Sequence, residues 1–382
     1  MAPVTLALAQ AKTRHPLYAR LAALGIPGNK TEQYRHFAIK PLLARDYTLK
    51  TAKDHTPKTG SRLVIENGSV VEVPEGCSVS YVSTFGADIK HYDALYFLSH
   101  LLSPPVICID IGTDLSFELH HVISDAQTLL PYRLCICTSP NTRCEIFETF
   151  DTARSEESLL LYGVDAFIQN DAHLRWIRDE GGAESNAAVI GTHRFDVAVQ
   201  AALVLKTFDF GSAHALHLYK IDLGRYGWCD ANHLLLASGE ARRGNVVHIN
   251  HNSPYAKCAQ DARSILKGKA TGIFDGLVKV AHGARCASAR QNSKAVLLDE
   301  NAYMYAKPQL EIYTDELEAS HGATIGQLDE RVLFYLRSRG ISETEARKML
   351  VLAFADVLID SVGESEIAER IHSDFENAYF TE

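Results

Sequence analysis

The chain has 382 residues, of which 46% are hydrophobic and 22% charged, a composition typical of a globular protein with one large domain or two to three smaller ones. Its formal net charge of -9 disfavours binding to nucleic acid, and no apolar stretch approaches the roughly 20 residues that cross a membrane. The N-terminal apolar run lacks a positively charged start, and eight cysteines are too few for a disulfide scaffold, so we expect no signal peptide and a cytoplasmic location.

Residues 1–55 are predicted to form an N-terminal helical domain. Leucines recur at helical spacing in 17–24, and Gly25 stands where a helix would end. A second helix is expected over 33–43.

The next region, 56–320, is predicted to be a β domain, because short strand-like runs recur between Gly, Asn, Asp and Ser residues. Such a pattern is typical of a sandwich, a barrel or a β-helix. The region is long for one sandwich, and Asn-Gly or Asp-Gly hairpin turns are infrequent, so we favour a solenoid. The clearest strand-like runs are 133–137, 144–150, 159–168, 173–177, 193–199, 214–223, 245–250, 276–280 and 308–313.

Residues 321–382 are predicted to form a C-terminal helical domain of three amphipathic helices. Gly340 is a natural stop for the first helix, and 342–345 has the pattern of a capping box that begins the second. The apolar faces of three short helices cannot all be buried among themselves. We therefore expect them to pack on the strand domain, on a partner, or on both.

The motifs of the common nucleotide-binding and hydrolytic enzymes are absent. There is no phosphate loop, no Gly-x-Gly-x-x-Gly after a strand, no Gly-x-Ser-x-Gly elbow and no His-Glu-x-x-His. The sequence therefore predicts a protein that is not an enzyme.

Cys135 and Cys137, together with Cys144, suggest a site for a soft metal, because Cys-x-Cys on a strand points both thiols to one face. The other interpretation is that small apolar thiols fill the inside of a strand, and we favour it because no second ligand pair stands at zinc-ribbon spacing. For the histidines at 120–121 and 248–251 we likewise favour a hydrogen-bond ladder between coils over a metal or acid–base role.

His321 has a different setting. It follows the last predicted strand, precedes the first C-terminal helix, and is next to Gly322. A junction of this kind is expected to be an exposed loop, where functional residues are common.

Three segments, 308–313, 320–324 and 333–340, resemble the SufD subunits of the SufB–SufC–SufD iron–sulfur cluster assembly complex. The resemblance is dense from about residue 250 to residue 355 and sparse at the N-terminus. It implies a mainly β fold, in which helical domains flank a right-handed parallel β-helix.

The resemblance also implies a function: a non-catalytic scaffold that pairs with SufB through the β-helices. The C-terminal helices would dock the SufC ATPase, which would perform the nucleotide chemistry. The residues predicted to contact partners are Phe334, Tyr335, Arg337, Arg339 and Phe354.

His321 matches the family histidine that helps to bind a nascent iron–sulfur cluster at the SufB–SufD interface. The cluster would be transient and shared with the partner, and we expect no cofactor in the isolated chain. Many SufD chains have a cysteine where this chain has Ala319, and SufB chains typically have a cysteine at the position of Leu336. The leucine and the short chain favour SufD over SufB.

Two alternatives stay open: a β-helix enzyme that acts on carbohydrate, and a SufB-like homodimeric scaffold. A deep cleft lined by charged residues would favour the enzyme, and a flat apolar or backbone-edge surface would favour subunit pairing. The sequence does not decide between a homodimer and a SufB heterodimer, between two-iron and four-iron clusters, or whether the complex binds flavin.

Overall fold

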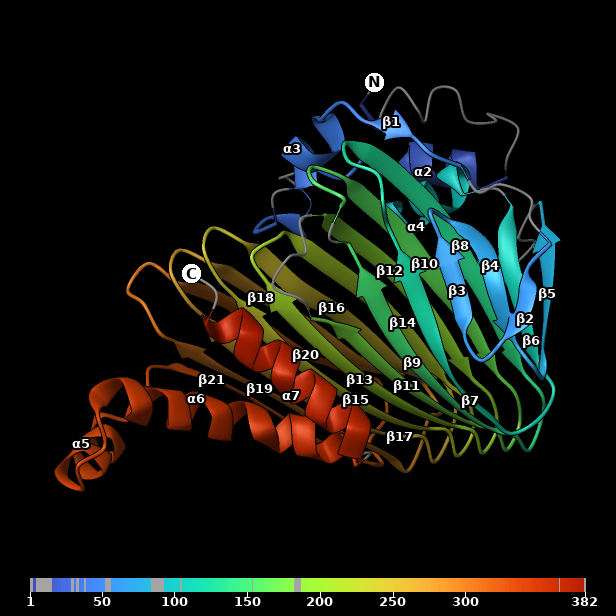
Figure 1. Cartoon of the computed structure of the whole chain (residues 1–382). Coiled ribbons are helices and arrows are strands. Elements are labelled where there is room, and N and C mark those ends of the chain that lie inside the picture. The colour runs from blue at the N-terminus through green and yellow to red at the C-terminus, as the bar shows by residue number, and fades with distance from the viewer. Residues whose placement is uncertain are drawn as a thin grey trace.

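The computed structural model of the chain is built around a parallel β-solenoid of about seven turns, with helices before and after it (Figure 1). The predicted β-helix between two helical regions is therefore confirmed. The structure describes residues 3–4, 16–28, 31, 34–37, 39–51, 56–83, 93–103, 105–152, 154–181, 187–363 and 365–380.

Alternate strands of the solenoid belong to two sheets, and from β6 onward the neighbours within each sheet are parallel. The first sheet has the order β20-β18-β16-β14-β12-β10-β8-β6-β5, with β1 beside β8, and the second has the order β2-β4-β3-β7-β9-β11-β13-β15-β17-β19-β21. The strands of the first sheet are β1 (Thr48–Leu49), β5 (Cys77–Val82), β6 (Val106–Ile111), β8 (Thr128–Thr138), β10 (Leu159–Ile168), β12 (Ala188–Val197), β14 (Ala215–Leu223), β16 (Arg242–His251), β18 (Thr271–Val280) and β20 (Tyr303–Ile312). Those of the second are β2 (Lys58–Gly60), β3 (Leu63–Glu66), β4 (Ser69–Pro74), β7 (Leu115–Val122), β9 (Arg143–Asp151), β11 (His173–Glu180), β13 (Ala202–Gly211), β15 (Trp228–Ala237), β17 (Lys257–Leu266), β19 (Ala287–Leu297) and β21 (Leu317–Gly326).

Side chains alternate between the inside and the outside of the solenoid, as the two-residue period of a strand requires. On β13, Leu203 and Leu205 lie in the apolar core between the two sheets. Phe208, of the opposite phase, packs against the C-terminal helices instead. Both faces of many strands are thus buried, which is why the strands contain long apolar runs.

Three helices, α2 (Pro16–Leu24), α3 (Ile39–Ala44) and α4 (Ala94–Leu102), cover the outer face of the first sheet (Figure 1). The first predicted helix is confirmed. The second is shorter than predicted, since 34–37 forms turns and residue 33 lies outside the described part of the chain. Helix α4 was not predicted from the sequence. All nine of its residues are buried, so it lacks the polar face that reveals a helix by its period.

The C-terminal helices are α5 (Glu330–Ser338), α6 (Glu343–Ile359) and α7 (Ser365–Phe380), with a short 3-10 turn, η2 (Asp360–Val362), after α6. Ser342 caps α6 by accepting a hydrogen bond of 3.2 Å from the backbone N–H of Glu345, which confirms the predicted start. Helices α6 and α7 pack on the outer face of the second sheet, whereas α5 projects beyond the solenoid (Figure 1). None of the described helices is both long and apolar enough to cross a membrane.

Polar contacts fix the end of α6 and the turn after it to the solenoid. Arg263 donates a hydrogen bond of 2.8 Å to the carbonyl oxygen of Phe354, and the Lys206 ammonium lies 2.7 Å from the Ser361 hydroxyl. Both cations point out of strands of the second sheet. These contacts leave α5 as the C-terminal helix with the least support from the solenoid.

A pair of carboxyl groups makes the docking of α7 sensitive to pH. Burial and the neighbouring carboxyl of Asp374 on α7 raise the pKa of Asp179 on β11 well above its usual range. The folded-state pKa of Asp179 therefore lies above its unfolded value. The contribution of this carboxyl to stability is fully present below the unfolded pKa, and it is lost as the pH rises through the folded pKa.

We expect Asp374→Asn to stabilise the chain at pH 7 by about 1 kcal/mol, because it removes the repelling charge. Urea unfolding at pH 5 and pH 7 would measure this. The difference in the free energy of unfolding between the two pH values should be smaller in Asp374→Asn than in the wild-type chain. Glu369→Gln, an exposed change on the same helix, should leave it unchanged. An unaltered pH dependence in Asp374→Asn would refute the carboxyl pair.

Candidate functional site

His321 lies inside the last strand of the second sheet and not at the predicted strand-to-helix junction. Strand β21 continues through His321 to Gly326, beyond the predicted domain boundary at residue 320. Gly322 does not end the strand, because β21 stays paired with β19 from Leu317 to Gly326. The prediction of an exposed loop was wrong, although the side chain is exposed.

The pairing register places His321 in a column of inward-facing side chains. Gln260 on β17 is level with Gln291 on β19, and Gln291 is level with His321 on β21. In earlier coils the same column holds Trp176 and Leu205, which belong to the apolar core. Along this one column, the inward-facing residues therefore change from apolar to polar toward the last coil.

The two glutamines are buried and linked, since the Gln291 amide donates a hydrogen bond of 2.8 Å to Gln260 Oε1. Within the described part of the chain, Gln291 Oε1 is buried without a hydrogen-bond partner. Such an orphaned acceptor is costly unless a donor reaches it. It lies one strand from His321 and could accept from the imidazole or from a bound group.

Gly276 on β18 makes room for this amide. A Cβ atom at that position would lie 2.3 Å from Gln291 Nε2. No role for Gln260 or Gln291 was predicted from the sequence. The usable signal in the sequence was a glutamine at an inward position of two strands that are neighbours in the second sheet.

The last coil of the solenoid is open. Strands β20 and β21 each pair on one side only among the described residues, and the inward-facing Ala319, His321 and Ala323 are all exposed. An uncovered coil end offers both unpaired backbone groups and apolar side chains to another chain. The large exposed apolar residues of this end are Tyr303, Tyr305, Ile312, Tyr313 and Ile325.

His321 belongs to no group of metal-ligating side chains within the described residues. The one group of three His, Cys, Asp or Glu residues found there, with ligand atoms within 4.8 Å, is Glu180, Asp209 and His217. Ala319 offers no ligand. A metal site at His321 would thus need further ligands from another chain.

The group of Glu180, Asp209 and His217 is better explained as part of a buried ion-pair network. Arg178 lies 2.6 Å from Asp209 and 3.3 Å from Glu180, and Arg243 lies 2.7 Å from the other oxygen of Glu180. Two guanidinium groups therefore already neutralise the two carboxylates. Burial lowers the pKa of His217 well below its usual value, so its ring is neutral there.

The histidine clusters have hydrogen bonds that fit the ladder interpretation. His121 lies 3.0 Å from Glu148 and 2.6 Å from the Tyr132 hydroxyl inside the solenoid. His251 Nε2 lies 3.1 Å from the Cys258 sulfur, on the next strand. The His121–Glu148 contact joins neighbouring strands of one sheet, as the ladder interpretation predicts, whereas His251 contacts residues that closely follow it in the chain.

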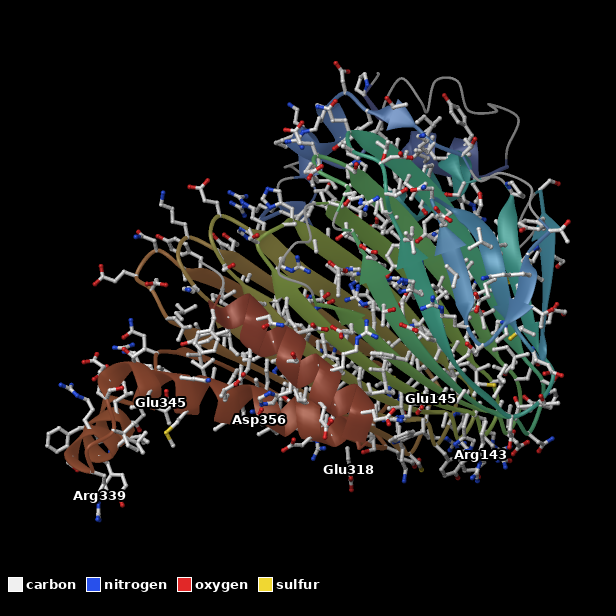
Figure 2. All side chains as sticks on the ribbon, viewed as in Figure 1. Arg143, Glu145, Glu318, Arg339, Glu345 and Asp356 are labelled. Carbon is white, nitrogen blue, oxygen red and sulfur yellow. The ribbon has the colours of Figure 1, made fainter. Side chains whose placement is uncertain are left out.

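Four of the predicted partner-binding residues lie on or next to the projecting helix α5. Phe334 is 74% exposed and Tyr335 is 56% exposed. The Arg337 guanidinium lies 3.5 Å from Glu343, and Arg339, which Figure 2 shows at the tip of the projection, lies over the Tyr335 ring. An aromatic and basic surface of this kind is typical of protein–protein interfaces.

Phe354 has a different environment from these four residues. It is half-buried against the cluster that joins α6 and α7 to the second sheet, and its ring lies 5.1 Å from the Arg263 guanidinium. The structure therefore gives Phe354 a contact within the chain, and its contact with a partner stays a prediction.

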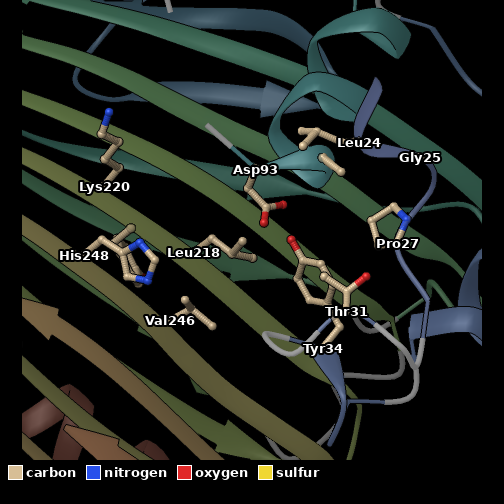
Figure 3. Close-up of a pocket in the computed structure, with 12 residues that line it drawn as sticks. Leu24, Gly25, Pro27, Thr31, Tyr34, Asp93, Leu218, Lys220, Val246 and His248 are labelled. Atoms are coloured by element: carbon tan, nitrogen blue, oxygen red, sulfur yellow. The ribbon is translucent and has the colours of Figure 1, made fainter. Parts of the chain in front are cut away.

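A cavity of about 400 Å³ lies between the N-terminal region and the first sheet (Figure 3). Tyr34 and Asp93 come from the N-terminal side, while Lys220 and His248 come from strands β14 and β16. Lys220 lies 3.5 Å from Asp222, and burial lowers the pKa of His248. The polar groups of the cavity are few and dispersed, so they do not indicate a particular ligand.

A hollow of about 580 Å³ on the flank of the second sheet contains charged residues, as the enzyme alternative predicts. However, Arg175 in this hollow already has partners within the chain, because its guanidinium contacts both Glu145 and the carbonyl oxygen of Val362 in the turn after α6. Arg143 and Glu145 lie on the same flank in Figure 2. These contacts attach the C-terminal turn to the sheet.

Comparisons with a family model and with individual known proteins point to the same family. Residues 121–354 match the family model described as SUF system FeS cluster assembly, SufBD core domain. The chain is 34% identical to an iron–sulfur cluster assembly SufBD family protein of Synechocystis sp. over 284 residues, which is 70% of this chain and 61% of that protein.

Two relatives carry a more specific name. The iron–sulfur cluster assembly protein SufD of Escherichia coli is 34% identical over 123 residues, or 32% of this chain and 29% of that protein. SufD of Bacillus subtilis is 30% identical over 150 residues, or 39% of this chain and 34% of that protein. The matches thus span less than two thirds of the length of these relatives.

Proposed function

The chain belongs to the SufB/SufD family, and on that premise we propose that it is a non-catalytic scaffold subunit in the assembly of iron–sulfur clusters. The observation that carries the proposal is the open last coil, in which His321 faces inward but is exposed. A partner solenoid stacked on this coil would cover the histidine and enclose a site between the two chains. SufB is the partner that we propose for this position.

The nascent cluster is the cargo of this scaffold. Imidazole is a competent ligand for iron next to thiolates, and in this account most thiolates come from SufB. His321 would supply one ligand from this chain, with the buried amide of Gln291 one strand behind it. Because Ala319 replaces a cysteine common in SufD, His321 acts without a neighbouring thiolate from its own strand.

The projecting helix α5 would dock the SufC ATPase. Its exposed Phe334 and Tyr335 form an apolar anchor, and Arg337 and Arg339 form a basic rim. Movement of SufC during its nucleotide cycle would reach the solenoid through α6, which packs on the second sheet.

Co-expression of the tagged chain with SufB and SufC tests the assignment. Both partners should co-purify with the wild-type chain, and Phe334→Asp should lose SufC but retain SufB, since it places a charge in the apolar anchor. Arg331→Ala, another exposed change on α5, should retain both. If the wild-type chain fails to bring down SufC, the assembly proposal is wrong.

A further inference from the structure

Three cysteines from two neighbouring strands lie together on the outer face of the first sheet. Cys135 and Cys137 on β8 have the opposite phase to Leu134 and Ile136, which lie in the core. The expectation that these two thiols fill the inside of a strand was therefore wrong, whereas Cys144 does lie in the core. The pairing of β6 with β8 places Cys108 directly beside Cys135.

The spacing of the sulfurs suits one thiophilic metal ion. The Cys135 and Cys137 sulfurs are 4.0 Å apart. Two thiolates on a tetrahedral zinc ion, each at about 2.3 Å from it, would be about 3.8 Å apart. Cys135 is also hydrogen-bonded to Cys108. Among the described residues the three sulfurs do not all lie within 4.8 Å of one another, so the side chains would have to turn toward a common point to surround an ion.

The side chain of Asp110 offers a carboxylate as a fourth ligand beside the three cysteines. Asp110 on β6 is level with Cys137 on β8, just as Cys108 is level with Cys135. The four side chains thus form a two-by-two arrangement on two adjacent strands, which lie about 4.8 Å apart. Three sulfurs and one carboxylate oxygen are a ligand set that zinc accepts.

The electrostatic environment favours a cation. Asp110 and Asp165 are the nearby carboxylates, and the Arg133 guanidinium is engaged 2.9 Å from Asp165. Thiolates at this place would repel the acids and each other, and a divalent ion would relieve that repulsion.

An ion can reach the cluster from solvent. Cys108 and Cys137 are partly exposed, and a hollow of about 370 Å³ is lined by Cys137, Asp110 and Cys77. We propose that Cys108, Cys135, Cys137 and Asp110 form a binding site for a single thiophilic divalent metal ion, for which Zn²⁺ is the probe. The site lies in the first coils of the solenoid and is independent of the proposed cluster site at His321.

Competition with a chromophoric zinc chelator, under reducing conditions and with the metal-stripped full chain, tests the proposal. We expect one tightly bound Zn²⁺ per chain, and Co²⁺ in its place should give thiolate-to-cobalt charge-transfer absorption. Cys108→Ser and Cys137→Ser should each weaken Zn²⁺ binding by at least about 100-fold, and Asp110→Asn by about tenfold.

Cys286→Ser is the matched control, because Cys286 is exposed and outside the cluster, so its loss should change nothing. Unfolding midpoints of the metal-free variants show whether a serine replacement impairs folding. Cys108 and Cys137 are chosen for replacement because both are only partly buried, so serine should disturb the fold little. Absence of tight Zn²⁺ binding by the wild-type chain, or unchanged affinity in both serine variants, would overturn the proposal.

Discussion

Replacement of His321 by alanine is expected to reduce the iron and acid-labile sulfide of the purified SufB–SufC complex with this chain by at least about tenfold. The complex itself should stay assembled, because the imidazole is exposed and its loss leaves the core intact. Iron and sulfide analysis after anaerobic purification, with subunit ratios from gel densitometry, gives both quantities.

His173→Ala is the control for this prediction. His173 is also an exposed strand histidine of the second sheet, but it lies on β11, far along the solenoid from the open end. Its replacement should leave the cluster content at the wild-type level. An intact complex with a normal cluster in His321→Ala would remove His321 from the mechanism.

The second large effect concerns stability. Arg178→Ala should lower the free energy of unfolding by about 3–5 kcal/mol, since it leaves the buried carboxylates of Asp209 and Glu180 without their shared guanidinium. All three side chains are buried inside the solenoid. Urea unfolding followed by circular dichroism measures the change.

An exposed ion pair provides the comparison. Lys269 and Glu240 lie 3.2 Å apart, with side chains 68% and 81% exposed, so Lys269→Ala should cost below about 1 kcal/mol. A similar small loss in Arg178→Ala would mean that water or rearranged side chains compensate the buried charges.

The order helix–strand–helix could be predicted from the sequence because strand-like runs and helix caps are local signals. The family resemblance, carried by 308–313, 320–324 and 333–340, is confirmed by the SufBD core match over 121–354. Strand length and turn residues alone did not distinguish a β-helix from a sandwich or a barrel. Helix α4 was missed because burial on every side removes the amphipathic period.

The sites were harder to predict, because they depend on which strands become neighbours. Cys108 and Cys135 are 27 positions apart in the sequence, and only the register of β6 with β8 brings them together. The phase of β8 was equally decisive, since it turned Cys135 and Cys137 outward. The role of His321 stays a prediction, and its place within a strand and its alignment with Gln291 required the coil register.

Iron and acid-labile sulfide, measured in the anaerobically purified complex with SufB and SufC and in the chain purified alone, test the central proposal most directly. We expect equal amounts of iron and sulfide in the complex and no labile sulfide in the isolated chain, because His321 alone cannot hold a cluster. A complex that forms but never contains sulfide, or a cluster on the isolated chain, would contradict it.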